Sequence, residues 1–199
     1  FFYVNLDPYA NAFNQEANGN CWEHDETDML PWIWERKYEL DSLCYPIQLA
    51  YLVWKNTGRT DHFDETFVKG VRRILEVWRT EQHHEERSPY HFVRKNCYFT
   101  DTLSRGGKGA LVKSGTGLIW SGFRPSDDSC VYGYLIPSNM FAVVVLGYLA
   151  EIANQVLGDE ALAAEAEAFR MEVKEAIETL AVVKNEYYGR IYAYETDGY

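Results

Sequence analysis

The sequence predicts an all-α fold in which helical hairpins alternate with long loops. Two pairs of segments carry apolar residues at three- and four-residue steps, and a short turn joins the members of each pair. A long stretch without periodicity separates the pairs, and alternation typical of strands is too sparse for a sandwich or an α/β sheet. This repetition favours an α/α toroid, a ring of helical hairpins with a binding cavity at its loop-rich end.

The first hairpin is expected within residues 34–78. The apolar positions of its first helix are Leu40, Leu43, Cys44, Ile47, Tyr51 and Trp54. Gly58 stands where a C-terminal cap belongs, and Pro46 predicts a helix start near it or a kink. The apolar positions of its second helix are Phe63, Phe67, Val71, Ile74 and Trp78. Either Asp61 or Asp64 is expected near the N-cap of that helix.

The second hairpin follows the aperiodic residues 85–136, and a connection that long is usually functional. Its first helix is expected to begin around Pro137 and to reach Leu157, with Gly158 as its stop. Asp159 is the expected cap of the next helix. The apolar stripe of that helix is Leu162, Ala166, Phe169, Val173, Ile177 and Leu180. Short extended pieces are expected over residues 187–194.

Length and composition favour one domain that handles a neutral polar ligand. The chain of 199 residues begins at Phe1 without a Met and stops at Tyr199 inside an apparent turn, so we expect one domain truncated at both ends. Its net charge of −11 disfavours binding to nucleic acids, whereas its 16% aromatic residues suit stacking on sugar rings. No run of about 18 apolar residues is present, so we expect no membrane span.

The cysteines and histidines show no metal-site spacing. The four cysteines, Cys21, Cys44, Cys97 and Cys130, are scattered without a CxxC pair, which favours free thiols and a cytoplasmic location. Secretion stays possible because the chain has no Met at its start. The adjacent pair His83 and His84 lacks the i,i+4 spacing of a zinc site. We therefore expect no metal and no cofactor.

The segment Trp120–Asp128 is the first candidate for chemistry. It combines Trp120, Arg124 and Ser126 with the adjacent acids Asp127 and Asp128 in the aperiodic stretch. Two neighbouring carboxyl groups in a closed site do not both ionise easily, and Arg124 is suited to hold one of them charged. That arrangement keeps a general acid protonated near neutral pH. A helix-capping cluster or Asx turn explains the same residues equally well.

Two other polar segments are further candidates. In residues 34–42, Glu35, Glu39 and Ser42 are expected on one helical face. Arg36, together with Asp41 or Lys37, is expected to reach toward the cavity mouth. A solvated helix surface is the simpler explanation of that pattern.

The segment Asp7–Asn14 offers Asp7, Asn11 and Asn14 for the dense hydrogen bonding that sugar hydroxyls require. The same residue types also favour ordinary turns.

Four strings along the chain resemble one enzyme family. They are DPYANAFN (7–14), WERKYELDSLCYP (34–46), TGLIWSGFRPSDDSC (116–130) and YLIPSNMFA (134–142), and they are similar to glycoside hydrolase family 125, the metal-independent exo-α-1,6-mannosidases. The resemblance implies an (α/α)6 toroid, of which residues 1–199 form a central part of a single catalytic domain. It implies metal-independent removal of terminal α-1,6-linked mannose from a mannose-containing oligosaccharide, with inversion.

The same resemblance assigns roles to the candidate residues. One of Asp127 and Asp128 is the general acid, and the general base is a Glu outside this chain. The substrate-binding residues it suggests are Trp120, Arg124, Ser126, Asp7, Asn11, Asn14, Arg36, Glu39 and Asp41. No oligomeric state is implied.

Two other classes of function fit the toroid. A sugar epimerase or a polysaccharide lyase uses His or Tyr pairs as acid and base, and His83, His84, Tyr90 and His91 offer such groups. A non-catalytic glycan-binding domain has no use for a buried acid pair.

Overall fold

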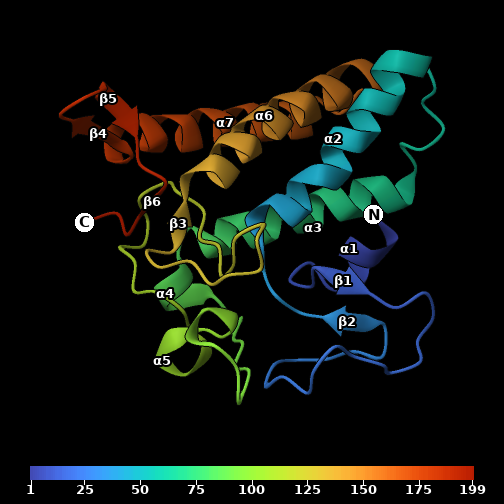
Figure 1. The fold of residues 1–199 in the computed structure, drawn as a ribbon. Helices are drawn as coiled ribbons and strands as arrows, with labels where there is room; N and C mark the ends of the chain where they lie inside the picture. The colour runs from blue at the N-terminus through green and yellow to red at the C-terminus, as the bar shows by residue number, and fades with distance from the viewer.

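The computed structural model describes residues 1–199 and is built on two long helical hairpins (Figure 1). Helix α2 (Leu40–Thr57) and helix α3 (Glu65–Glu81) form the first. Helix α6 (Ile136–Ile152), extended by the π-helical turn η2 (Ala153–Leu157), and helix α7 (Glu160–Leu180) form the second. Helix α6 packs against both α7 and α2, which joins the hairpins into one bundle.

The helix ends follow the capping residues expected from the sequence. Asp64 caps α3, because its carboxylate accepts a hydrogen bond from the Phe67 amide, so the expected choice between Asp61 and Asp64 falls on the latter. Asp159 caps α7 in the same way. Gly58 ends α2 with a left-handed backbone (φ 73°), the conformation that glycine adopts at least cost. These caps confirm both predicted hairpin turns.

The start of the first hairpin differs from the prediction. Helix α2 begins at Leu40 and runs through Pro46 without ending there. Residues Ile33–Glu35 form strand β2, which pairs antiparallel with β1 (Ala12–Phe13). The prediction that Glu35, Glu39 and Ser42 share one helical face is therefore wrong, because cross-strand pairing holds Glu35 in an extended backbone.

Short elements occupy the remaining chain. They are α1 (Phe2–Leu6), α4 (His84–Arg87), η1 (Phe99–Asp101), α5 (Ser104–Gly107), β3 (Tyr134–Leu135), β4 (Val182–Asn185), β5 (Gly189–Tyr192) and β6 (Glu195–Thr196). Strand β3 pairs with β6 and β4 with β5, both antiparallel, so the chain has three two-stranded sheets and no large one. The extended structure expected within residues 187–194 is confirmed by β5, whereas β4 and β6 lie outside that range.

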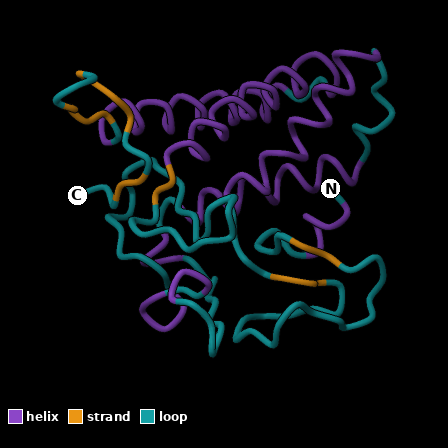
Figure 2. The backbone as a smooth tube through the Cα atoms, viewed as in Figure 1, coloured by secondary structure: helices purple, strands orange, loops and turns teal.

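The tight turns and the long loops lie at opposite ends of the bundle. The α2–α3 and α6–α7 turns gather on one side, whereas the long connections fill the other side and the bottom of the view (Figure 2). The core between the helices is one hydrophobic cluster to which all four long helices contribute, with Ile47, Trp78, Leu146 and Phe169 fully buried. All four cysteine thiols are free.

Helix Ile136–Leu157 has the length and composition of a membrane span. Polar residues such as Ser138, Asn139 and Glu151 interrupt it, so the helix contains no continuous run of about 18 apolar residues. In the structure it packs against α2 and α7 and buries Val145, Leu149 and Ile152 in the core. That packing is what the central helix of a bundle requires.

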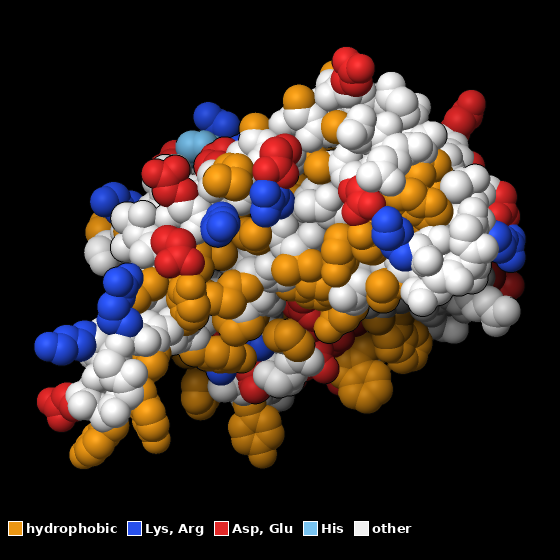
Figure 3. Space-filling model, turned by 90° about the horizontal axis from the view of Figure 1, so that it is seen from above, with side chains coloured by type: hydrophobic (Ala, Val, Ile, Leu, Met, Phe, Trp, Pro, Cys, Tyr) orange, Lys and Arg blue, Asp and Glu red, His pale blue; other side chains and the backbone are white.

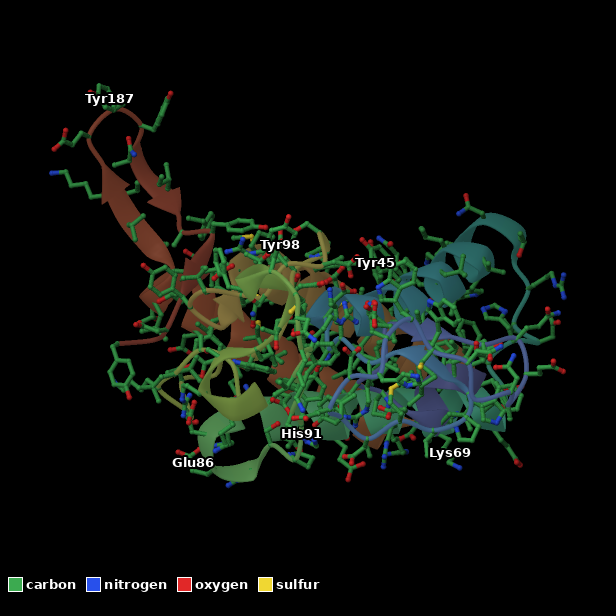
Figure 4. All side chains as sticks on the ribbon, turned by 60° about the horizontal axis from the view of Figure 1, so that its bottom comes forward. Tyr45, Lys69, Glu86, His91, Tyr98 and Tyr187 are labelled. Carbon is green, nitrogen blue, oxygen red and sulfur yellow. The ribbon has the colours of Figure 1, made fainter.

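Hydrophobic side chains also remain on the surface. A broad band of them crosses the face seen in Figure 3. On α2, Tyr45, Leu49 and Leu52 are exposed and line a groove of about 840 Å³. At the opposite end of the molecule the β4–β5 hairpin projects from the body, with Tyr187 near its tip (Figure 4).

Candidate active site

The segment Trp120–Asp128 forms a tight hairpin with its two aspartates at the tip. Phe123 and Ser129 form an antiparallel bridge, and the Arg124 amide donates to the Asp128 carbonyl at 2.8 Å. The Asp127 amide donates back to the Arg124 carbonyl at 2.9 Å, and Asp127 has a φ of 68°. Asp is one of the few residues with a side chain that adopts this left-handed backbone readily. The turn geometry thus presents the Asp127 side chain, which is 64% exposed, to solvent.

A buried lysine lies under the tip of this hairpin. The Lys37 side chain is only 2% exposed, and its Nζ donates to Asp101 Oδ1 at 2.5 Å and to the Asp127 carbonyl at 3.0 Å. The same Nζ lies 3.9 Å from Asp127 Oδ1. A buried ammonium requires such partners, because desolvation without them is costly. Lys37 therefore fixes the backbone of the tip and faces one of its carboxylates.

The ionic network extends from Asp101 to Arg94. The Arg94 guanidinium binds Asp25 at 2.7 Å, Glu35 at 2.8 Å and Asp101 at 3.3 Å. Burial opposes the charge on Asp101, but the hydrogen bonds and charges of Lys37 and Arg94 outweigh it and lower the pKa of that carboxyl. Two buried cations are thus compensated by carboxylates around them, which keeps this side of the site rigid.

Asn11 joins the N-terminal segment to this network. Its Nδ2 donates to Glu35 Oε2 at 3.1 Å, and its Oδ1 accepts the Lys37 amide at 3.0 Å. Asn11 is half-buried, so it lies at the edge of the site. The structure therefore brings Asn11 together with the lysine under the hairpin tip.

Glu39 is the carboxyl group in this region with a pKa near neutrality. It stands at the N-cap position of α2, and Ser42 Oγ donates to its Oε2 at 2.7 Å. Burial raises the pKa of Glu39 to about 7; the Ser42 hydrogen bond opposes this shift, and the charges of Asp41 and Asp127 add to it. Burial likewise raises the pKa of Asp41, which is 5% exposed and accepts from Ser138 Oγ at 3.4 Å.

Arg124 forms an ion pair with Glu195, which is not among the sequence-based candidates. Its Nε lies 2.5 Å from Glu195 Oε1, and the other oxygen of Glu195 accepts the amides of Val131 and Tyr132, both at 2.8 Å. The sequence suggests that Arg124 holds one of Asp127 and Asp128 charged. In the structure its guanidinium binds Glu195 instead. This contact ties the hairpin to strand β6.

The remaining tip residues differ in their surroundings. Ser126 is exposed, and its hydroxyl donates to Asp128 Oδ2 at 3.1 Å. Asp128 is half-buried. The segment therefore forms a hairpin turn rather than the helix cap or Asx turn that the sequence allows, and this turn places two consecutive aspartates at its tip.

Asp7 and Arg36 form a buried ion pair behind the network. Arg36 Nε lies 2.7 Å from Asp7 Oδ2, and both side chains are 8% exposed. The guanidinium also lies 5.4 Å from the ring centroids of Tyr9 and Tyr90. These contacts use the polar atoms of Asp7 within the protein, so the pair supports the site rather than lining it.

Asn14 and Trp120 are also placed away from solvent, unlike the expectation that they contact substrate. Asn14 is 8% exposed and donates to the carbonyls of Asn20, Pro31 and Ile33. Trp120 is fully buried, so its ring has no face open to a sugar. Asn14 therefore holds loops in place through hydrogen bonds, and Trp120 does so through packing inside the protein.

Three residues that take part in the site are missing from the sequence-based candidates: Arg94, Asp101 and Glu195. The sequence suggests Lys37 only as an alternative to Asp41 at the cavity mouth, whereas the structure buries it under the hairpin tip. Arg94 and Asp101 lie seven residues apart in a stretch without periodicity, and the contacts Arg94–Glu35, Asp101–Lys37 and Glu195–Arg124 span 59 to 71 residues of sequence. No spacing rule identifies such contacts.

No group of three or more His, Cys, Asp or Glu side chains is arranged to hold a metal ion. The chemistry that the described groups offer is proton transfer and hydrogen bonding to a polar ligand, through carboxyl groups at the tip and at Glu39.

Comparisons with known proteins agree with the resemblance seen in the sequence. The family model described as "Metal-independent alpha-mannosidase (GH125)" matches residues 1–199. The chain is 32% identical over 215 residues to the meiotically up-regulated gene 157 protein of Schizosaccharomyces pombe, which covers 96% of this chain and 41% of that protein.

A solved structure from Streptococcus pneumoniae is 51% identical with a TM-score of 0.94, and the match covers 98% of this chain and 46% of that one. It is a metal-independent alpha mannosidase in a non-productive substrate complex with α-1,6-mannobiose. The chain thus spans less than half the length of both relatives. Because the family model matches throughout, the chain belongs to the metal-independent alpha-mannosidases of glycoside hydrolase family 125.

Proposed function

We propose that the protein containing this chain is an exo-acting α-mannosidase that removes terminal α-1,6-linked mannose. Family membership supports hydrolysis of α-mannosides, and the 51% identical structure with α-1,6-mannobiose supports the linkage. The structural observation that carries the proposal is the hairpin tip, which presents the consecutive residues Asp127 and Asp128 and places Asp127 next to the ammonium of Lys37.

The proposed reaction proceeds with inversion. One aspartate of the pair donates a proton to the glycosidic oxygen, while a Glu outside these residues activates a water on the opposite face of the sugar. In this scheme the two carboxyl groups lie roughly 6.5–9.5 Å apart, which leaves room for the water. A fixed and solvent-accessible tip suits the proton donor, because the glycosidic oxygen must approach it closely.

Exposure separates the proposed sugar contacts from the residues that support them. Asn11, Glu39, Arg124 and Ser126 are exposed or half-buried, so we assign them to the substrate hydroxyls. The buried candidates are Asp7, Asn14, Arg36, Asp41 and Trp120, and we assign these to holding the loops in place.

We also propose that the two hairpins belong to an (α/α)6 toroid. The two tight turns lie at one end of the bundle and the long connection between α3 and α6 lies at the other (Figure 2), an arrangement typical of a toroid. The outer face of α2 exposes Tyr45 and Leu49 along an apolar groove, which is the surface a neighbouring hairpin of a ring covers. The matched mannosidase structure is about twice as long as the match, which supplies chain enough for further hairpins.

The acid assignment is tested with Asp127→Asn and Asp128→Asn in the intact protein. On α-1,6-mannobiose we expect the variant of the proton donor to lose on the order of 10²–10⁴-fold in kcat. On a dinitrophenyl mannoside it keeps most of its activity, since that leaving group departs without a proton. Asp61→Asn, on the exposed α2–α3 turn, is the matched control. Near-wild-type activity of both tip variants on mannobiose would contradict the assignment.

The products separate this function from its alternatives. An NMR time course on α-1,6-mannobiose that shows β-mannose first supports inverting hydrolysis. An isomerised or unsaturated product instead indicates an epimerase or a lyase. Saturable binding without any product indicates a glycan-binding domain.

A further inference from the structure

A buried acid–base pair lies below the hairpin, at the end of α3. Glu81 is the last residue of that helix and is fully buried. Its Oε1 accepts hydrogen bonds from Tyr9 Oη at 2.8 Å and Ser88 Oγ at 2.7 Å, and its Oε2 lies 2.7 Å from His84 Nδ1. Three polar groups therefore converge on one carboxylate in the core.

The hydrogen-bond partners define the geometry of this pair. His84 Nε2 lies 2.8 Å from the Lys108 carbonyl, which only accepts, so Nε2 carries a proton. Ser88 Oγ accepts the Tyr90 amide at 3.2 Å, so its own hydrogen points to Glu81. Glu81 Oε1 thus accepts from two hydroxyls, and its Oε2 shares one proton with His84 Nδ1.

This pair lies directly against the base of the hairpin. The His84 ring stacks on the Trp120 ring with centroids 3.6 Å apart and an interplanar angle of 14°. The Trp120 amide in addition donates to the Glu81 carbonyl at 3.3 Å. Side chains and backbone of the pair therefore both hold the residue at which the hairpin begins.

From Trp120 the contacts continue to the lysine under the tip. The opposite side of the indole stacks on Tyr38 with centroids 6.0 Å apart. The Tyr38 carbonyl accepts the amides of Gly122 and Phe123 at 3.1 and 3.0 Å, and Tyr38 directly follows Lys37 in the chain. Tyr38 thus connects the indole both to Lys37 and to the hairpin. A displacement of the indole is expected to shift Lys37 and the hairpin tip together.

We propose that Glu81 and His84 are positioning residues: as a buried, hydrogen-bonded acid–base pair they set, through Trp120, the placement of the Asp127–Asp128 tip toward the glycosidic oxygen. The proposal rests on the mannosidase function proposed above. Neither residue touches substrate in this scheme, because both are buried. A pair that only fills the core changes stability when it is altered, but it does not change proton donation selectively.

The test uses His84→Asn and Glu81→Gln in the intact protein, with His83→Asn as the matched control. His83 is the adjacent histidine, and its ring lies against Gly115 outside the pair. At a temperature where all variants are folded, we expect kcat on α-1,6-mannobiose to fall on the order of 10²-fold for both pair variants, because small misplacements of a catalytic group cost about that much. KM stays within about threefold of wild type, since the sugar contacts are retained.

Leaving-group dependence separates positioning from general damage. On the dinitrophenyl mannoside, which needs no proton, both pair variants are expected to stay within about threefold of wild type, whereas a distorted site loses activity on both substrates. Combining His84→Asn with the Asn variant of the proton donor is expected to add no further loss on mannobiose, because the two changes remove one function. Additive losses would overturn the proposal.

Nitrogen NMR tests the pair without activity. His84 Nε2 is expected to carry a proton, because it faces the Lys108 carbonyl, and Glu81→Gln is expected to shift the Nδ1 resonance, because Nδ1 loses its carboxyl partner. An unchanged Nδ1 resonance in Glu81→Gln, or an unchanged kcat in folded variants, contradicts the inference. If His84→Asn does not fold, Glu81→Gln decides by the same criteria, because Gln keeps the size of Glu. A wild-type protein inactive on both mannosides would refute the proposed function, while the NMR result still reports on the pair.

Discussion

Glu39→Gln is expected to make the protein more stable at alkaline pH and to leave its stability unchanged at acidic pH. Glu39 stands at the start of α2 with a pKa raised to about 7, mainly by burial. Gln has the same shape, cannot ionise, and still accepts the hydrogen bond from Ser42. The substitution therefore removes the titration and little else.

The sign and size follow from the two pKa values of Glu39. In the unfolded chain its pKa is 4.5, and in the fold it is about 7, so the fold disfavours the ionised form. Well below pH 4.5 Glu39 is protonated in both the folded and the unfolded state, so it does not lower the free energy of unfolding. As the pH rises from 4.5 to 7, the unfolded state ionises first, and the free energy of unfolding falls progressively. The full difference corresponds to about 3 kcal/mol, and partial contact with water reduces it to about 1–2 kcal/mol.

Denaturant unfolding followed by circular dichroism at pH 4.5 and pH 8 measures this difference. We expect equal free energies of unfolding for wild type and Glu39→Gln at the lower pH, and a gain of about 1–2 kcal/mol for the variant at the higher pH. Glu76→Gln is the control, because Glu76 is exposed on α3 and pairs only with Arg73 at 3.6 Å. A gain that is the same at both pH values, or a wild type more stable than the variant at pH 8, would refute the reasoning.

Two further substitutions test contacts that hold the hairpin. Glu195→Gln replaces the charge-assisted bond to Arg124 with an amide, so we expect the free energy of unfolding to fall by about 2 kcal/mol; an unchanged urea midpoint would count against this anchor. Gly133→Ala adds a methyl group 2.6 Å from the Val112 side chain at a φ of +82°, and we expect a loss of about 2–4 kcal/mol. Gly19→Ala, with a φ of +73° and open space, is the control and costs about 1 kcal/mol; equal losses for the two would exclude the steric explanation.

The helices and their ends could be predicted because their causes are local. An apolar stripe at helical spacing and a capping residue three positions before its amide partner are both visible in a short window. Asp64 and Asp159 accept the amides of Phe67 and Leu162, as the pattern requires. The same locality explains why Gly58 marks the end of α2 correctly.

The segment before α2 could not be predicted because non-local pairing decides its conformation. Residues 34–39 have the charge pattern of a helix, yet Glu35 pairs with Ala12 across two strands and accepts from Asn11. The same contacts bring Lys37 to Asp101, which is 64 residues away. Helical spacing contains no information about partners so distant in sequence. The ion pairs of the network could therefore not be predicted, even where one of their members was a candidate.

Trp120 shows a second limit of inference from composition. An aromatic residue in a polar loop suggests a sugar platform, but this ring is buried between His84 and Tyr38. Space for it depends on glycines of the neighbouring loop segments: a methyl group on Gly109 or Gly133 would lie 2.7 or 2.9 Å from the indole. These close approaches show that the ring is packed, although in the sequence each glycine looks like an ordinary loop residue.

The position of the aspartate tip is a property of the whole fold rather than of its own nine residues. Lys37 holds the tip from the strand-to-helix segment, Glu195 holds it from the last strand, and Glu81 and His84, at the junction of α3 and α4, hold Trp120 at its base. Each anchor comes from a different part of the chain and each is charged or buried, so removing one leaves an unpaired group rather than a free loop. A tight turn with an aspartate at positive φ is common, but a turn fixed by three such anchors holds its carboxylates in one place, and proton donation to a bound glycoside requires that placement.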